Sequence, residues 1–439
     1  MNYLTLGYIF KAKKILKEMA SIKKSEEDFK DYIKSLGPGL ITGASDDDPS
    51  GIATYSQAGA GFGLSTLWTA WITFPLMACI QEMCARIGMV TCSGLTNVIK
   101  KHYSKKLLYV MLLLSFPAIT LNIGADIAGM GAVSHLLIPA VPSFAFSIAF
   151  TFLLMYVIIQ YSYKKLAAIL KWLCLVLFLY FIVPFLVTKN WGAVLKNTFI
   201  PTFHFDRDFC EILVAILGTT ISPYLFFWQA NMEAENQNNG GVHIIVDKLS
   251  IRKMRSDIIT GMFFSNLVMF FIILTTGIVL FNAGIHHIDT VEQAAQALKP
   301  LAGNLSYLLF AVGVIGTGLL SIPVLAGSLS YILSETFDWE EGLDKKFSEA
   351  KGFYVTIIIS LLIGLFINLT KITPFQALFV TAIVYGITAP VLIGVILHIS
   401  NNKKIMGDET NGKFSNFLGI LTFVLMSTAA VALIYFQFE

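Results

Sequence analysis

Three consecutive carboxylates lie inside a segment that is otherwise apolar and long enough to cross a membrane. They are Asp46, Asp47 and Asp48, and Pro49 follows them directly. Burying a carboxylate in a bilayer is costly, so such residues usually face a water-filled path and serve a function. Pro49 has no N–H to donate, and its ring disfavours the helical conformation at the residue before it, so we expect the helix to break here.

A helix that breaks at membrane depth leaves main-chain carbonyl groups without helical partners. Such a break is tolerated only where the backbone is buried in protein or lines a water-filled cavity. The stretch from Gly37 to Gly63 therefore predicts half of a cation site. That half consists of a carboxylate and of the carbonyls freed at the end of a half-helix.

A second run of small and polar residues ends in a proline much later in the chain. Residues 218–224 read Gly-Thr-Thr-Ile-Ser-Pro-Tyr, so we expect breaks at Pro49 in one half and at Gly218 and Pro223 in the other. Broken helices at corresponding places in two halves are typical of transporters built from inverted repeats. Simple bending is the alternative, because spanning helices tolerate prolines and others occur here at Pro323 and Pro390.

The composition excludes a soluble globular protein. Of the 439 residues, 56% are hydrophobic and 13% are charged, and the mean hydropathy is +0.71. Apolar runs of spanning length recur along the chain, so we expect an all-α integral membrane protein with about eleven spans. The expected spans are 37–60, 64–88, 107–136, 143–162, 166–188, 210–230, 257–282, 304–334, 352–370, 375–398 and 414–437.

The basic residues are unevenly divided between the loops on the two sides of this bundle. Alternate loops, counted from the N-terminus, hold 24 Lys and Arg residues, whereas the other loops hold 5. The positive-inside rule then predicts a multi-pass protein of the cell membrane with a cytoplasmic N-terminus and an extracellular C-terminus. We expect it to act as a monomer in the lipid bilayer, with no nucleic-acid partner.

The spacing of the two breaks predicts how the chain divides. The second break lies five spans after the first, which gives five spans per repeat. An odd number of spans per repeat gives the two halves opposite orientations. We expect a basic cytoplasmic N-terminal segment (1–36) and a first inverted repeat with spans one to five (37–188). A second repeat with spans six to ten (189–398) is followed by a cytoplasmic loop and span eleven (399–439).

Around the breaks the chain resembles the Nramp family of divalent-metal transporters. That family has an Asp-Pro-Gly-Asn motif in its first span and a Met-Pro-His motif in its sixth. Residues 37–39 and 48–54 match the first region, residues 218–223 match the second, and residues 85–88 and 90–91 resemble the end of the family's second span. The resemblance implies a LeuT-type fold that works by alternating access. That fold has two inverted five-helix repeats with broken helices 1 and 6, plus an eleventh helix.

The departures from the family motifs concern the metal ligands. Asp48 matches the metal-binding aspartate, but Gly51 replaces the binding asparagine and Ser222 replaces the binding methionine. A thioether is a soft ligand that suits transition metals, whereas oxygen ligands suit Mg²⁺ and Ca²⁺. We expect Asp48, Ser222 and a backbone carbonyl near Thr219 to hold a partly hydrated Mg²⁺, with Mn²⁺ also carried. The ion is the substrate, no cofactor is expected, and the pattern resembles the Nramp-related branch associated with magnesium transport.

The groups that would relay a proton are mostly replaced. The two histidines that follow the family's span-six proline align with Tyr224 and Gln229, and Gly129 replaces a glutamate of span three. Asp126 matches the aspartate of that same segment. Because a relay needs titratable groups in sequence, we expect uptake without obligatory H⁺ coupling. Tyr224, Gln229 and Asp126 are then expected to line the cavity.

Asp46 and Asp47 replace apolar or aromatic residues of the family. Neighbouring residues on a helix point in different directions, so the three aspartates cannot all bind one ion. We expect Asp46 and Asp47 to lie in a vestibule, where they attract cations or hold hydrated metal. Solvation in an aqueous cavity is the alternative.

Three other polar residues lie within the spans. Glu82 and Arg86 are four residues apart near the end of span two, so we expect an ion pair along the helix, with an inner gate as the alternative. Gln376 in span ten could reach the site.

Three other functions are alternatives to Mg²⁺ transport without H⁺ coupling. A proton-coupled Mn²⁺ or Fe²⁺ symporter of the Nramp type differs in its metal preference. A sodium-coupled organic-solute symporter on the same fold is disfavoured, because an anionic substrate would meet three aspartates. An intramembrane hydrolase using Asp48 and Asp126 lacks the usual paired motifs, so we expect no enzyme.

Overall fold

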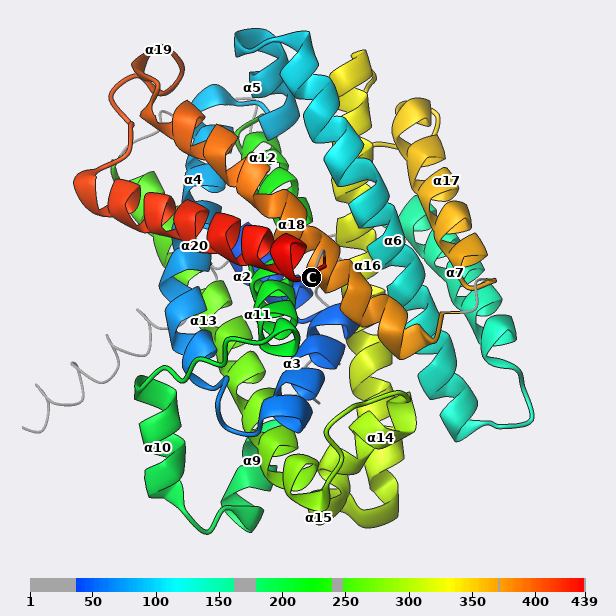
Figure 1. Cartoon of the computed structure of the whole chain (residues 1–439). Coiled ribbons are helices and arrows are strands. Elements are labelled where there is room, and N and C mark those ends of the chain that lie inside the picture. Colours follow the sequence, from blue (N-terminus) through cyan, green and yellow to red (C-terminus); the bar gives the residue numbers. More distant parts are fainter. Residues whose placement is uncertain (1–36, 162–178, 239–247, 370–371, 438–439) are drawn as a thin grey trace, which may run out of the picture.

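The described part of the chain is helical, with helices of membrane length arranged as a bundle (Figure 1). The computed structural model describes residues 37–161, 179–238, 248–369 and 372–437. The expected N-terminal segment 1–36 and the first part of the fifth span lie outside the described residues. Seven described helical segments are long and apolar enough to cross a membrane on their own, and residues 351–366 form a shorter apolar helix.

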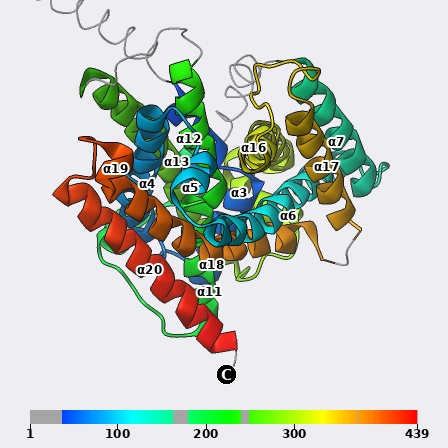
Figure 2. The same ribbon diagram turned by 90° about the horizontal axis from the view of Figure 1, so that it is seen from above.

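The helices follow the expected spans closely. Those that correspond to spans are α2 (Pro38–Asp46), α3 (Pro49–Phe62), α4 (Trp68–Thr91), α6 (Lys105–Leu137), α7 (Ser143–Gln160), α9 (Leu179–Val187), α11 (Arg207–Thr220), α12 (Pro223–Asn238), α13 (Lys248–Val279), α16 (Ser306–Phe337), α17 (Lys351–Ile367), α18 (Pro374–Asn401) and α20 (Lys413–Gln437). Shorter helices connect them: α5 (Leu95–His102), α10 (Trp191–Phe199), α14 (Val291–Ala295), α15 (Lys299–Ala302) and α19 (Lys403–Met406). Viewed from above, α3 lies near the middle, with α20 at one edge and α7 and α17 at the opposite edge (Figure 2).

Spans one and six are broken, as the sequence predicted. The first break separates α2 from α3, and Asp48 there has an extended backbone with φ −69° and ψ 171°. The second separates α11 from α12, and Ile221 ends α11 with φ −112° and ψ 58°. By contrast, α16 and α18 continue through Pro323 and Pro390. A proline alone therefore does not break these helices.

Gly218 does not lie at the second break, contrary to our expectation. It is inside α11, and the helix continues to Thr220. A Cβ at Gly218 would lie 2.0 Å from the carbonyl oxygen of Ala382 and 2.3 Å from the backbone nitrogen of Gly386. Only glycine permits this close approach of two backbones, so Gly218 sets the packing of α11 against α18.

Both halves of the first broken helix pack against α13. A Cβ at Gly43 would lie 2.3 Å from the carbonyl oxygen of Gly261, and a Cβ at Gly59 would lie 2.0 Å from Oγ1 of Thr276. The carboxylate of Asp257 on α13 also accepts hydrogen bonds from the first backbone N–H groups of α2 and its cap, at 2.7 to 3.1 Å. A negative charge there satisfies groups that a helix start leaves free and opposes the positive end of the helix dipole.

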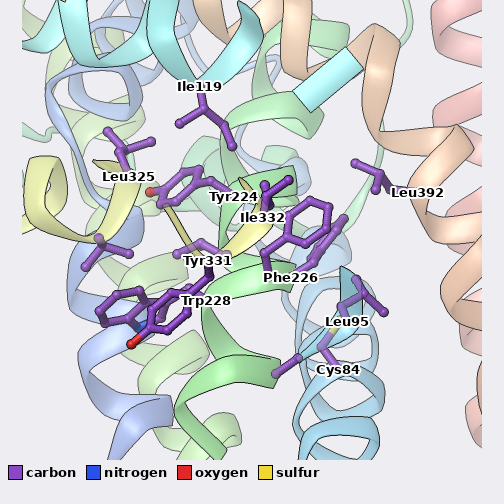
Figure 3. Close-up of a cluster of buried hydrophobic side chains, with 14 of the residues drawn as sticks. Cys84, Leu95, Ile119, Tyr224, Phe226, Trp228, Leu325, Tyr331, Ile332 and Leu392 are labelled. Atoms are coloured by element: carbon purple, nitrogen blue, oxygen red, sulfur yellow. The ribbon is translucent and has the colours of Figure 1, made fainter. Parts of the chain in front are cut away.

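The start of α12 is held by a cluster of large apolar side chains (Figure 3). Phe226 and Trp228 on α12 are fully buried, together with Leu325, Tyr331 and Ile332 on α16. The rings of Trp228 and Tyr331 lie 6.4 Å apart at a steep angle, which is a favoured arrangement of aromatic pairs. This packing fixes the direction in which α12 leaves the break.

Polar contacts join the helices at the end of the bundle that carries α5 and α19 (Figure 1). The expected Glu82–Arg86 pair forms at 3.0 Å, and Glu82 also pairs with Arg255 of α13 at 2.9 Å. The Arg86 guanidinium donates further hydrogen bonds to the carbonyl of Glu409 and to the side chain of Asn411. Arg86 and Glu82 thus connect α4 to α13 and to the segment before α20.

Candidate functional site

Asp48 is buried between the two halves of the first broken helix, and both of its carboxylate oxygens accept hydrogen bonds. Its side chain is the N-cap of α3, with Oδ1 accepting from the Gly51 N–H at 2.7 Å. Oδ2 accepts from Nδ2 of Asn122 on α6 at 2.8 Å. Asp48 is 2% exposed. Its carboxylate therefore faces the interior of the bundle and not the lipid.

The two breaks lie against each other. The Tyr224 hydroxyl, at the start of α12, donates to the main-chain carbonyl of Ser45 near the end of α2 at 3.0 Å. On the other side, a Cβ at Gly51 would lie 3.4 Å from Oγ1 of Thr219. The start of α3 thus faces the end of α11, which brings the Asp48 turn beside Thr219.

Ser222 lies at the second break and bonds to the carbonyls around it. Its hydroxyl donates to the carbonyl oxygen of Thr219 at 2.6 Å, and the carbonyl of Gly218 is 3.2 Å away. The hydroxyl oxygen keeps its two lone pairs, because it acts here as a donor. The predicted oxygen ligands from Thr219 and Ser222 are therefore adjacent.

Asp46 and Asp47 point toward α13 and away from the partners of Asp48. The Ser265 hydroxyl donates to Oδ2 of Asp46 at 2.8 Å and lies 3.4 Å from Oδ1 of Asp47. Oδ1 of Asp46 has no hydrogen-bond partner among the described residues, although the side chain is buried. Within the described ranges, no group of three His, Cys, Asp or Glu side chains could hold a metal ion. A site here would use one carboxylate with other oxygens and water.

Asp126 lies one helical turn beyond Asn122 on α6. Its Oδ2 is 3.4 Å from the Ser321 hydroxyl of α16, and its Oδ1 has no hydrogen-bond partner in the described part of the chain. Asp126 is fully buried, as is Asn122. α6 therefore presents two polar side chains to the start of α3.

Gln229 belongs to α12, and its side chain faces α2. Its Oε1 accepts from the Thr42 hydroxyl at 2.6 Å, and its Nε2 donates to Glu233 at 3.0 Å. Glu233 is itself buried, with 6% of its surface exposed. We did not single out Glu233 from the sequence, although its i,i+4 spacing from Gln229 in a spanning helix was a usable signal.

Gln376 does not reach the site. It forms a capping box with Thr373 at the start of α18, where its side chain binds the backbone of its own helix. Thr381, about one and a half turns further along, is the α18 residue that does reach it. Its hydroxyl lies 3.0 Å from Oδ1 of Asn122 and 3.1 Å from the Ser50 hydroxyl.

A cavity of about 660 Å³ opens near the far end of α3, toward the end of the bundle that carries α14. Three acidic side chains line it, namely Asp206, Asp208 and Glu211 at the start of α11. Gln57 also lines this cavity. Its side chain donates a hydrogen bond to the His286 carbonyl and accepts one from the Ile288 N–H. Carboxylates around a concave opening attract cations to it.

Known sequences similar to this chain are membrane transporters. The family model described as natural resistance-associated macrophage protein-like (Nramp) matches residues 39–436. The divalent metal cation transporter MntH of Caldanaerobacter subterraneus subsp. tengcongensis is 23% identical over 397 residues, which cover 90% of this chain and 91% of that protein. The MntH protein of Bacillus subtilis is 22% identical over 420 residues, 94% of each protein.

Solved structures of transporters share the fold. A manganese transporter of Eremococcus coleocola, in complex with an aromatic bis-isothiourea substituted compound, has a TM-score of 0.74 at 17% identity and covers 92% of this chain and 87% of that one. MhsT in complex with L-phenylalanine has a TM-score of 0.59 at 14% identity, with 92% and 98% covered. Similarity at these identities shows the fold alone, and it confirms the LeuT-type fold predicted from the sequence.

Proposed function

Because the chain belongs to the Nramp family, and is therefore a membrane transporter and not an enzyme, we propose that it carries divalent metal cations and prefers Mg²⁺. The observation that carries this proposal is the buried Asp48 carboxylate at the meeting point of the two broken helices. We infer that Asp48, the Thr219 carbonyl and the Ser222 hydroxyl supply oxygen ligands there. We infer that water completes the ion's coordination shell.

The chemistry of the ligands favours a hard ion. Ser222 offers a hydroxyl where the family's binding residue is a methionine, and a hydroxyl oxygen does not select soft transition metals. Mg²⁺ dehydrates reluctantly and is usually held by one or two carboxylates while it keeps several waters. Asp46 accepts a hydrogen bond from Ser265, and Asp47 lies 3.4 Å from the same hydroxyl. We infer that these two carboxyl groups beside the site attract hydrated cations to its vestibule.

Manganese is the competing substrate. The relatives from Caldanaerobacter and Bacillus are divalent metal cation transporters, and the structural neighbour from Eremococcus is a manganese transporter. The name of the structural neighbour favours Mn²⁺, and the names of the two relatives leave the divalent metal open. We infer that Mn²⁺ is also carried here, because its oxygen chemistry is close to that of Mg²⁺.

We further propose that transport does not require H⁺ coupling. Tyr224 and Gln229 stand where the family has histidines, and their side chains bond to Ser45, Thr42 and Glu233. Neither a phenol nor an amide exchanges a proton near neutral pH. A dye inside proteoliposomes that reports a pH fall in proportion to metal uptake would overturn this proposal.

The orientation in the membrane follows from the basic loops. Lys100 pairs with Asp338 at 2.6 Å and Arg255 pairs with Glu82, so the basic segments around α5, α13 and α16 gather at one end of the bundle. We infer that this end is cytoplasmic, with the C-terminus outside the cell. Membrane-impermeant labelling of a cysteine introduced at Asp408, expected only after the cells are opened, tests the assignment.

Calorimetry on the purified protein tests the substrate directly. We expect Mg²⁺ to bind with an affinity at least equal to that of Mn²⁺, and Asp48→Asn to abolish both binding and uptake into proteoliposomes. The matched control is Asp408→Asn, which changes an exposed carboxylate in a loop and should behave as the unaltered protein. Full-rate uptake by Asp48→Asn would overturn the site, and Mn²⁺ binding without Mg²⁺ binding would overturn the preference.

A further inference from the structure

The amide of Asn122 connects three helices at the carboxylate of the proposed site. Its Nδ2 donates to Asp48 at the first break, and its Oδ1 lies 3.0 Å from the Thr381 hydroxyl on α18. Asn122 itself belongs to α6 and is fully buried. The side chain thus uses both ends of its amide, one toward the metal-site carboxylate and one toward a different helix.

The surrounding hydroxyl groups determine which way the amide points. The Ser50 hydroxyl lies 2.8 Å from the carbonyl of Leu378, and the Thr381 hydroxyl lies 2.7 Å from the same carbonyl. Each hydroxyl has one proton, so Ser50 can satisfy Leu378 while Thr381 donates to Oδ1 of Asn122. A flipped amide would instead place a carbonyl oxygen against the Asp48 carboxylate, with no proton between them.

The backbone that carries Asn122 is held in place by α17. A Cβ at Gly364 would lie 3.0 Å from the backbone nitrogen of Gly124, so the two helices touch directly two residues beyond Asn122. Nδ2 of Asn368 also donates to the carbonyl of Gly124 at 3.3 Å. The Asn122 amide therefore projects from a part of α6 that is packed closely against α17.

We propose that Asn122 is a positioning residue for metal transport, which fixes the plane of the Asp48 carboxylate and so presents its remaining lone pairs to the ion in one geometry. The inference rests on the proposed role of Asp48. A fixed carboxylate matters for Mg²⁺, because this ion demands near-octahedral geometry at short distances. The Gly51 N–H holds Oδ1 in the same way, and it belongs to the broken helix itself. Asn122 is the contact that ties the carboxylate to α6.

The test measures Mg²⁺ uptake into proteoliposomes and Mg²⁺ binding by calorimetry, both with the full-length protein. Asn122→Leu removes the donor at similar volume, and we expect KM and Kd to rise roughly tenfold or more, as for a lost hydrogen bond to a charged group. The maximal rate should stay within about twofold, because no ligand is removed. Thr381→Val leaves the Nδ2 donor but frees the amide to turn, so a smaller rise, roughly threefold, is expected.

A double variant separates positioning from general damage. If Thr381 acts through Asn122, adding Thr381→Val to Asn122→Leu should raise KM no further. The matched control is Thr120→Val on the same helix, whose hydroxyl bonds only to the Phe116 carbonyl at 2.7 Å and should leave KM unchanged. Full multiplication of the two effects, or an unchanged KM in Asn122→Leu, would overturn the proposal.

Three further outcomes are decisive. If Asn122→Leu does not fold, Thr381→Val decides alone, and an unchanged KM in that variant contradicts the positioning role. If Asp48→Asn abolishes uptake while Asn122→Leu keeps its normal KM, only the role of Asn122 is wrong. If Asp48→Asn transports normally, the proposed site itself is wrong.

Discussion

The hydroxyl of Tyr224 donates a hydrogen bond to the main-chain carbonyl of Ser45 across 3.0 Å, and this bond joins the two broken helices directly. Ser45 belongs to the last turn of α2, where carbonyl groups lose their helical partners. Tyr224 is the first residue after Pro223, at the start of α12. The Ser45 carbonyl, which lies at the first break, thus accepts a hydrogen bond from Tyr224, which the second break positions.

Replacing Tyr224 with Phe tests the value of this bond. The buried Ser45 carbonyl would lose its donor, so we expect the free energy of unfolding to fall by about 1–2 kcal/mol. The KM for Mg²⁺ should change little, because the phenol is not a proposed ligand. Thermal unfolding in detergent measures the first effect and uptake measures the second. Tyr180→Phe is the control, since its buried hydroxyl has no hydrogen-bond partner among the described residues, and an equal loss in both variants would contradict the idea.

Restoring the family's ligands should change the metal preference. In a variant with Ser222→Met and Gly51→Asn, we expect Cd²⁺ to bind roughly tenfold or more tightly, because a soft thioether joins the site. The backbone at Gly51 accommodates a Cβ atom, because the nearest atoms to it would lie at ordinary contact distance, 3.4 Å. Calorimetry with Cd²⁺ and Mg²⁺ provides the measurement. Ser222→Ala with Gly51→Asn serves as the control without sulfur, and equal Cd²⁺ affinity in the two variants would place residue 222 outside the site.

Asp257 should determine how firmly the start of α2 is held. An amide in its place, Asp257→Asn, keeps one acceptor oxygen and loses the negative charge at the helix start. We expect faster hydrogen exchange in residues 37–46 and a loss of about 1–2 kcal/mol in stability. The control Asp206→Asn alters the N-cap of α11. In that variant, hydrogen exchange should become faster at the start of α11 and stay unchanged in α2. Unchanged exchange of α2 in Asp257→Asn would show that the glycine contacts with α13 suffice.

The vestibule role of Asp46 can be measured through KM. Asp46→Asn replaces a buried carboxyl group next to the site with an amide, which cannot become negatively charged when a cation arrives, so we expect KM for Mg²⁺ to rise severalfold while the maximal rate changes less. Glu340→Gln, an exposed carboxylate between α16 and α17, is the control with unchanged KM. A normal KM in Asp46→Asn would favour the simpler interpretation, in which Asp46 has no part in attracting cations.

Glu341 should make stability depend on pH. It lies between α16 and α17, where burial raises the pKa of its carboxyl to about 9 and the nearby charges of Glu335 and Glu235 add to the rise. The folded protein keeps this proton at a pH where the unfolded chain, with a pKa near 4.3, has released it. Stability is therefore expected to fall as pH rises from about 5 to about 9.

Melting temperatures at pH 6 and pH 9 test this dependence. Glu341→Gln stays neutral, so its melting temperature should fall less over this interval than that of the unaltered protein. Glu340→Gln is the matched control, because Glu340 is exposed and the Lys345 beside it holds its pKa below the usual range. If both variants follow the pH dependence of the unaltered protein, Glu341 is not the group that titrates.

Local chemistry accounts for what the sequence alone determined. Pro49 and Pro223 each follow a polar residue in an apolar span, and a missing N–H acts on the helix that contains it. The two breaks, the span limits and the burial of Asp48 could therefore be read without knowing any neighbour. The matched breaks also predicted a division into inverted repeats, whereas the LeuT-type architecture was implied by the resemblance to the Nramp family and not by the spacing of the apolar runs.

Only the tertiary structure decided which side chains meet at the breaks. Asn122, Thr381 and Ser265 come from three different helices, and each reaches an aspartate or its partner because of how those helices pack. From the sequence we expected Gln376 of α18 to be able to reach the site, yet its position at the helix start made it a cap. Partners across a bundle depend on helix rotation and on close glycine contacts, as at Gly218, and these are properties of pairs of helices that no single segment of sequence contains.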